Sequence, residues 1–169
     1  MRQRILIPLD GSKLAEEAIA RLQALFSGER TQVHLLTVLP DIERLDALVQ
    51  FPLVNRELQK ATEAAQKHQE QYTRAYLDMV AWSLEDAGYE VETHIVYGQP
   101  ASGIVYMAQA IQADLIIMTS HGRGANAQWR YGGVTERVLD ACDTPVMVVP
   151  VRKRLIAAKD ASEEAEMAA

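Results

Sequence analysis

A glycine-rich loop follows an apolar run in the last third of the chain. The run stops at Thr119, and the loop behind it contains Gly122, Gly124, Gly132 and Gly133 before a helical pattern begins. Glycine lets backbone N–H groups come close to phosphate oxygens, and the dipole at a helix start favours an anion. A strand, a glycine-rich loop and a helix start in this order indicate a phosphate site. Many α/β proteins use the same order as a plain connector, so both interpretations stay open.

Patterns for catalysis or metal binding are weaker. His121 follows Ser120, but adjacent side chains on an extended segment point apart, so we expect a hydrogen-bonding loop residue rather than a Ser–His catalytic pair. His34 and His94 fall in apolar runs and His68 in a polar helical stretch, so their spacing indicates no metal site. The sequence contains neither a dinucleotide-binding fingerprint nor a Walker sequence.

Five short apolar runs must position these residues. Three of them are rich in Ile, Leu and Val with little alternation, as expected of strands that are covered on both faces. Helical patterns separate the runs, and right-handed crossovers then give an α/β fold with a five-stranded parallel sheet, order 3-2-1-4-5, and helices on both faces. The runs are RILIPL, VHLLTVL, VETHIVY, DLIIMTS and PVMVVPV, of which VETHIVY alternates and is typical of an edge strand.

The predicted ligand edge lies beyond the carboxyl ends of the strands. Open α/β sheets bind ligands there, at the point where the strand order reverses. The loops after the first, second and fourth strands converge at that point in the predicted order. The glycine-rich loop is one of these three, which favours a binding role for it.

Four helical patterns connect the runs. The first is expected to be capped by Ser12, and the second extends from about residue 55 to 87 with Gly88 as a left-handed cap. A third opens after Pro100, and a fourth spans about residues 134 to 141. The predicted inner faces are Leu14, Ala18, Leu22 and Leu25 in the first helix, Tyr72, Tyr76, Met79, Val80 and Leu84 in the second, and Ile104, Ala108 and Ile111 in the third.

Composition places further limits on function. The 169 residues suit one domain over residues 1–151, followed by a charged tail, residues 152–169, that we expect to be frayed or disordered. A net charge of -6 gives no basic footprint for nucleic acid. The single cysteine, Cys142, and the lack of a membrane-length apolar run favour a cytoplasmic protein that has no membrane partner. The segment 40–54 fits none of these patterns and is either a short helix or a flap.

Three blocks of the sequence resemble the universal stress protein family. They are ILIPLDGS near the start, GQPASGIVYMAQAIQADLIIMTSHGR in the middle and GGVTERVLDACDTPVMVVP near the end, and they cover about residues 4 to 151. The resemblance implies an adenine-nucleotide alpha hydrolase-like fold and a homodimer, often joined by antiparallel pairing of the last strand. One branch of the family binds ATP and another does not.

The ATP-binding branch carries a spaced glycine motif, which this chain matches in part. The motif is Gly, two residues, Gly, nine residues, Gly, then Ser or Thr. Gly122 and Gly132 match its second and third glycines, whereas Thr119 replaces the first glycine and Gly133 replaces the hydroxyl residue. The loss of one hydroxyl donor is worth about 0.5–1.5 kcal/mol net. We therefore expect a phosphate cradle that is weakened but still present.

The same resemblance implies roles for residues outside the loop. Asp10 would lie against the nucleoside, where a carboxylate can accept hydrogen bonds from ribose hydroxyls, although with Ser12 it can instead cap the first helix. Val38 would present the backbone of the second strand to adenine. Arg123 lies inside the loop itself, and its position there predicts added charge for the phosphate contacts. The expected ligand is ATP, ADP or AMP, with or without Mg²⁺. The complete predicted site is Pro8, Leu9, Asp10, Val38, Thr119, His121, Gly122, Arg123, Gly132, Gly133 and Val134.

Two functional hypotheses follow. The first is a homodimeric, adenine-nucleotide-binding module that acts in the stress response. The second is a dimeric scaffold that binds no nucleotide and acts through protein partners. An enzyme is a third and weaker reading, because no activated nucleophile or paired carboxylates are evident; weak ATP hydrolysis is the most that we expect.

Overall fold

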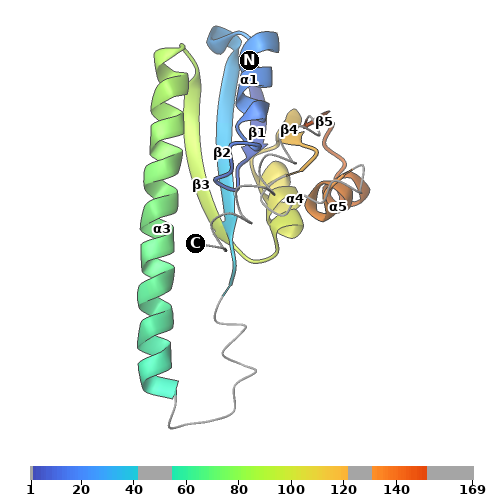
Figure 1. Ribbon diagram of the computed structural model, residues 1–169. Helices are drawn as coiled ribbons and strands as arrows, with labels where there is room; N and C mark the ends of the chain where they lie inside the picture. Colours follow the sequence, from blue (N-terminus) through green and yellow to red (C-terminus); the bar gives the residue numbers. More distant parts are fainter. Residues whose placement is uncertain (1, 42–54, 122–130, 152–169) are drawn as a thin grey trace, which may run out of the picture.

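The computed structural model describes residues 2–41, 55–121 and 131–151 (Figure 1). Several expectations fall outside these ranges: those for Gly122 and Arg123, for most of the segment 40–54, and for the tail 152–169. Within the described residues, no helix combines the length and the apolar composition that a membrane span requires.

A five-stranded parallel sheet forms the centre of the fold. Its order is β3-β2-β1-β4-β5, which confirms the predicted order and places β3 at one edge. The strands are β1 (Gln3–Pro8), β2 (Thr31–Leu39), β3 (Glu90–Tyr97), β4 (Leu115–Thr119) and β5 (Val146–Val149). Ile5, Leu6 and Ile7 of β1 are fully buried, because helices cover this central strand on both faces.

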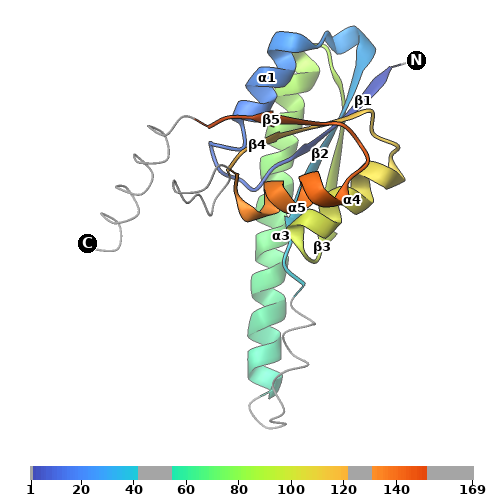
Figure 2. The same cartoon turned by 90° about the vertical axis from the view of Figure 1, so that its right-hand side faces the viewer.

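The helices form a layer on each side of the sheet. The helices α1 (Glu17–Leu25) and α3 (Asn55–Asp86) cover one face, and α4 (Pro100–Ala110) and α5 (Gly133–Ala141) cover the other (Figures 1 and 2). A short 3-10 turn, Gly28–Arg30, leads into β2. Each face has its own apolar core: Ile5 and Ile7 pack toward α1 and α3, and Leu6 packs toward α4 and α5.

The first helix begins later than its sequence suggests. Ser12 opens a turn, in which its hydroxyl accepts a 3.2 Å hydrogen bond from the backbone N–H of Ala15, and α1 itself starts only at Glu17. The prediction that Leu25 lies on the buried stripe is wrong, because 55% of it is exposed. Phe26 leaves the helix in an extended conformation and packs against the core instead.

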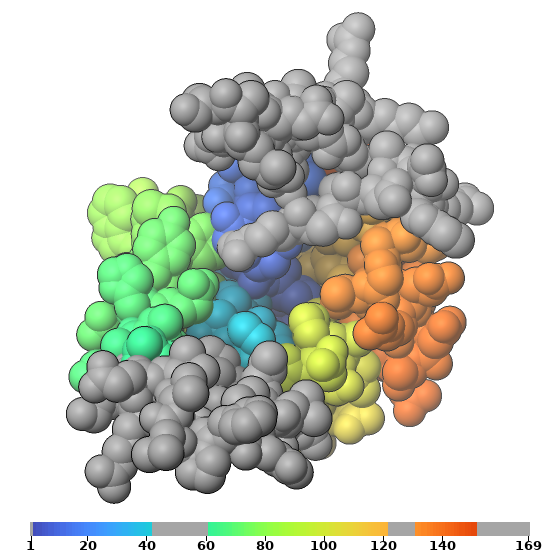
Figure 3. Space-filling view, turned by 60° about the horizontal axis from the view of Figure 1, so that its bottom comes forward, coloured from blue at the N-terminus to red at the C-terminus, as the bar shows by residue number. Residues whose placement is uncertain are grey.

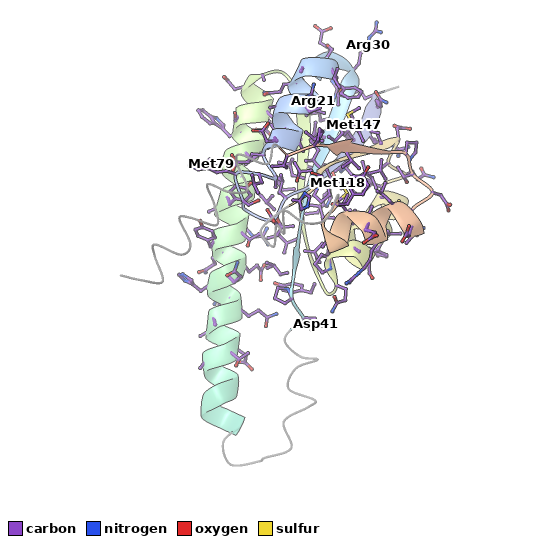
Figure 4. The ribbon with its side chains drawn as sticks, turned by 45° about the vertical axis from the view of Figure 1, so that its right-hand side comes forward. Arg21, Arg30, Asp41, Met79, Met118 and Met147 are labelled. Atoms are coloured by element: carbon purple, nitrogen blue, oxygen red, sulfur yellow. The ribbon has the colours of Figure 1, made fainter. Side chains whose placement is uncertain are left out.

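The inner face of α3 is offset from the predicted one. Leu77, Val80 and Leu84 pack into the core, whereas the side chains of Tyr72 and Met79 are 68% and 61% exposed. Met79 is labelled on α3 in Figure 4. Repeated steps of four drift around a helix with about 3.6 residues per turn. At about 100° per residue, Tyr72 and Met79 lie more than about 100° around the helix axis from the centre of the face that carries Leu77, Val80 and Leu84. The helix ends as predicted, because Gly88 follows it with a φ of +88°.

Candidate functional site

A cavity of about 320 Å³ opens at the carboxyl ends of the central strands. It lies where β1 has β2 on one side and β4 on the other, which is the point of strand-order reversal. In Figure 3 the blue, cyan, yellow and orange surfaces of the segments that line it meet in the middle of the view. Its lining residues are Pro8, Leu9, Asp10, Ala15, Leu36, Val38, Pro100, Ile104, Met118, Thr119, His121, Gly132, Gly133, Val134 and Thr135.

The structure brings nine of the eleven predicted site residues to this cavity. The two others, Gly122 and Arg123, lie outside the described residues. The nine come from the end of β1, from β2, from the end of β4 and from the start of α5. They are Pro8, Leu9, Asp10, Val38, Thr119, His121, Gly132, Gly133 and Val134.

Asp10 is held by a tight turn at the end of β1. Its Oδ1 accepts hydrogen bonds from the backbone N–H of Ser12 at 3.0 Å and from the Ser12 hydroxyl at 2.6 Å. The backbone before it is fixed as well, because the N–H of Leu9 donates to the carbonyl of Leu36 and the hydroxyl of Thr37 donates to the carbonyl of Leu9. Asp10 therefore forms a turn with Ser12 and also lines the cavity. It does not cap α1 directly, because that helix begins only at Glu17.

A second cavity adjoins the first at Asp10 and Val38. It has a volume of about 420 Å³ and lies between the end of β2 and the middle of α3, where Gln69, Tyr72 and Tyr76 line it. Asp10 therefore borders both spaces. A ligand that fills the first cavity can extend past Asp10 toward α3.

The backbone of Val38 faces the cavity side of β2. The pairing of β1 with β2 stops at Pro8 and Leu36, so no β1 residue pairs with Val38. The carbonyl of Leu36 accepts from Leu9 on the β1 side, whereas the carbonyl of Leu39 accepts from Gly98 on the β3 side. Alternate residues of a strand direct their backbone groups to the same side, so Val38 follows Leu36. The N–H and C=O of Val38 therefore point toward the space that opens where β1 ends.

Hydrogen bonds between β4 and α5 shape the other wall. The hydroxyl of Thr119 donates to the carbonyl of His121 at 2.8 Å, and the hydroxyl of Thr135 donates to the carbonyl of Thr119 at 3.1 Å. The N–H of Gly132 donates to the carbonyl of Ser120 at 2.7 Å and is therefore already engaged. The N–H groups available to an anion are those of the first turn of α5, beginning with Gly133 and Val134, since the first N–H groups of a helix lack an intrahelical partner.

Ser120 and His121 do meet, contrary to the expectation that adjacent side chains point apart. His121 Nδ1 lies 3.2 Å from Ser120 Oγ, and both residues are buried. β4 ends at Thr119, so both residues lie beyond the strand and its regular alternation of side chains does not continue. Ser120 Oγ also accepts a hydrogen bond from the N–H of Val151, and only His121 of the pair lines the cavity. The serine therefore serves to hold the segment after β5.

Six lining residues were not predicted from the sequence. Thr135 is one position beyond the predicted loop residues, and Pro100 and Ile104 come from α4, which no loop argument considers. Met118, labelled near the middle of Figure 4, belongs to β4 and packs toward α4 and α5. Ala15 and Leu36 complete the set. Leu36, Met118 and Thr135 had a usable signal, because each lies one or two positions from a predicted residue on the same strand or helix.

Comparison with known proteins decides the family. A sequence model described as the universal stress protein family matches residues 1–150. The chain belongs to the universal stress protein family. The universal stress protein MJ0577 of Methanocaldococcus jannaschii is 30% identical over 154 residues, which span 88% of this chain and 95% of the relative. The solved structure of MJ0577 superposes with a TM-score of 0.77 at 29% identity, covering 90% of this chain and 99% of that one.

More distant universal stress proteins share the fold. UspA of Lactobacillus plantarum is 25% identical with a TM-score of 0.62, and the match covers 88% of this chain and 99% of UspA. A universal stress protein from Arabidopsis thaliana, solved with AMP bound, is 15% identical with a TM-score of 0.60, covering 90% and 94%. A universal stress protein in complex with cAMP is 20% identical with a TM-score of 0.53, covering 87% and 95%.

Proposed function

We propose that this chain is an adenine-nucleotide-binding regulatory protein of the stress response, with ATP as its ligand. One observation carries the proposal: nine residues that were predicted from separate blocks of the sequence line a single cavity at the strand-order reversal. Such a position is where open α/β sheets hold nucleotides. The fold also accommodates adenine nucleotides in two of its distant members.

Three parts of the cavity wall supply the chemistry of a nucleotide site. The carboxylate of Asp10 is a hydrogen-bond acceptor suited to ribose hydroxyls. The backbone of Val38 offers one donor and one acceptor where β1 ends, which suits the edge of adenine. The first turn of α5 supplies N–H groups and a favourable dipole for phosphate.

The two departures from the glycine motif are compatible with this site. The hydroxyl of Thr119 turns to the carbonyl of His121, and the residue is buried. Gly133 has a helical backbone and keeps its N–H at the start of α5. A binding function suits this wall better than a catalytic one, because Ser120, the hydroxyl residue next to His121, does not line the cavity. Mg²⁺ could accompany the phosphates of ATP, with its ligands supplied largely by those phosphates and by water.

We also propose that the protein forms a homodimer through β5. This strand lies at the edge of the sheet and pairs only with β4 among the described residues. Its sequence, VMVV, contains no charge to prevent further pairing, and Val146, Met147 and Val148 remain partly exposed. A second copy can cover the edge with the same strand across a two-fold axis.

The binding proposal is tested by calorimetry with ATP, ADP and AMP on the whole chain. Asp10→Ala should weaken binding by about 1–3 kcal/mol, because a ribose hydroxyl loses its acceptor. Ser12→Ala is the matched control, since it removes the 2.6 Å hydroxyl bond to Asp10 and leaves the carboxylate in place. We expect Ser12→Ala to bind nearly as well as the wild-type chain.

The other outcomes distinguish the alternatives. Equal losses in the two variants would mean that Asp10 acts only through the turn. If the wild-type chain binds none of the three nucleotides, the scaffold hypothesis replaces this one. That alternative is favoured by the engagement of the Gly132 N–H, which removes one donor from the cradle.

A further inference from the structure

Two histidines and a glutamate converge on the sheet face that α4 covers in part. His34 Nδ1 lies 3.0 Å from His94 Nε2 and 3.7 Å from Glu92 Oε2, and His94 Nε2 lies 3.9 Å from the same Glu92 oxygen. His34 is buried, His94 is partly buried and Glu92 is exposed. The cluster therefore reaches from the sheet interior to the surface.

Strand register creates this cluster, which the spacing of the sequence conceals. His34 of β2 is the register partner of Glu92 of β3, and His94 follows Glu92 by two residues on the same face. Some 60 residues separate His34 from the other two along the chain. Spacing along the chain indicated no metal site, because spacing does not take pairing across the sheet into account.

The three facing atoms have the dimensions of a metal site. A point equidistant from the three lies about 2.1 Å from each of them, which matches Zn–N and Zn–O distances. Two imidazoles and one carboxylate form a donor set that borderline divalent transition ions accept, with room for water or a further ligand. An ion at that point would replace the present hydrogen bond between the two rings.

Neighbouring groups already orient the ligands. Gln32 Nε2 donates to Glu92 Oε1 at 2.8 Å, which holds the carboxylate while its other oxygen faces the two rings. Hydrogen bonds of this kind to ligating carboxylates are typical of metal sites.

The hydrogen bonding of His34 is incomplete within the described part of the chain. Its Nε2 is buried and has no hydrogen-bond partner among the described residues. Within the ranges that the structure describes, the polar contacts of the ring are therefore all at Nδ1, with His94 at 3.0 Å and with Glu92 at 3.7 Å. A metal bond at Nδ1 would supply stabilisation that a single neutral hydrogen bond does not.

We propose that His34, Glu92 and His94 form a binding site for a zinc-class divalent cation, with at least one coordination position open to solvent. The carboxylate is essential to it, because Arg4 adds positive charge near His34 and an ion held by two neutral rings alone would be repelled. The site is separate from the nucleotide cavity, although the two are linked through Leu36, which lines that cavity and is the register partner of His94.

Calorimetric titration with ZnCl₂ tests the proposal on the full-length, untagged chain, stripped with a chelator and free of nucleotide. We expect one Zn²⁺ per chain, and Co²⁺ should produce visible absorption bands in the same protein. His94→Ala should lower the Zn²⁺ affinity more than about 100-fold, since loss of an outer hydrogen-bond partner alone costs 10–100-fold. Glu92→Gln, a milder change at an exposed position, should also lower it substantially.

Two control variants keep the test specific. His68→Ala removes an exposed histidine of α3, and Cys142→Ser removes the only thiol; neither should change the affinity or the stoichiometry. Circular dichroism checks that every variant is folded. Absence of Zn²⁺ binding in the wild-type chain overturns the proposal, as does unchanged affinity in folded His94→Ala and Glu92→Gln. A loss of Zn²⁺ affinity in either control variant would assign the ion to a different site and would also overturn the proposal.

Discussion

The hydroxyl of Thr135, in the first turn of α5, donates a 3.1 Å hydrogen bond to the carbonyl oxygen of Thr119, the last residue of β4. A second bond, from the N–H of Gly132 to the carbonyl of Ser120, lies beside it. These two hydrogen bonds fix the start of α5 against the end of β4. They therefore orient the first N–H groups of α5 toward the cavity. The position of the proposed phosphate cradle therefore depends on Thr135.

Thr135→Val should destabilise the protein and weaken nucleotide binding together. The change keeps the shape of the side chain but leaves the buried carbonyl of Thr119 without this donor, at about 1–3 kcal/mol. Urea unfolding measures the stability and calorimetry measures the affinity for ATP. Thr135→Ser is the matched control, because it retains the hydroxyl and should bind ATP nearly as the wild-type chain does. Equal binding by Thr135→Val and the wild type would show that the bond does not position the cradle.

The sheet was predictable because its strands carry a strong, local signal. Ile5, Leu6 and Ile7 form an uninterrupted apolar run, and such a run has few alternatives to a central strand. Helix boundaries and faces were less predictable: Ser12 is a good cap residue, yet the hydrogen bonds of its side chain with Asp10 and Ala15 form a turn ahead of α1. Local propensity cannot tell these two uses of a serine apart.

Site residues that belong to a sequence motif were predictable. Residues that reach the site only through packing across the sheet were not. Gly132 and Gly133 were found by their spacing, and the structure places them on the cavity wall. Pro100 and Ile104 lie on the same wall only because α4 crosses the sheet at that point. The pairing of His34 with Glu92 depends on the exact register of β2 and β3, which one sequence does not specify.

Gly103→Ala should destabilise the protein even though alanine is the better helix former. A Cβ at this position would lie 2.8 Å from Val38 Cγ2 and 3.1 Å from Val96 Cγ2, two β-branched side chains with little rotamer freedom. The helix propensity gain is about 1 kcal/mol, whereas overpacking costs about 1–3 kcal/mol. We expect a net loss in urea unfolding and weaker nucleotide binding, since Val38 lines the cavity.

Ser102→Ala is the control for that change. Ser102 is the exposed neighbour of Gly103 on α4, so the substitution adds helix propensity without contact with the sheet. It should leave stability equal or slightly higher and should not affect binding. If Gly103→Ala proves as stable as Ser102→Ala, α4 has room to move away from the sheet and the close packing is not required.

The proposed dimer predicts a definite mass and a definite way to disrupt it. Light scattering should give twice the chain mass of 18.8 kDa at micromolar concentration. Val148→Lys places a charge on the partly exposed edge strand β5 and should shift the mass to that of the monomer. Met79→Lys, on the exposed side of α3, is the control and should remain dimeric. A wild-type monomer at these concentrations would contradict the dimer.

Gly133→Ser is the sharpest test of ATP as the ligand. Gly133 is the first residue of α5, and a Cβ built on it would have no heavy atom within 4 Å apart from its immediate neighbours. Serine should therefore fit without strain and restore the hydroxyl that the ATP-binding motif has at this position. The added hydrogen bond should tighten ATP binding by about 0.5–1.5 kcal/mol. AMP should gain much less, because it lacks the outer phosphates that the hydroxyl would contact.

Gly133→Ala separates the hydroxyl from the rest of the change. It adds the same Cβ, and both residues are better helix formers than glycine, so unfolding in urea should show both variants at least as stable as the wild-type chain. Calorimetry should then show tighter ATP binding for Gly133→Ser only. If the serine variant is well folded and gains no affinity for ATP relative to AMP and to Gly133→Ala, the start of α5 does not bind the outer phosphates. The ligand would then be a monophosphate, or the cavity would bind no nucleotide, and the AMP titration of the wild-type chain decides between them.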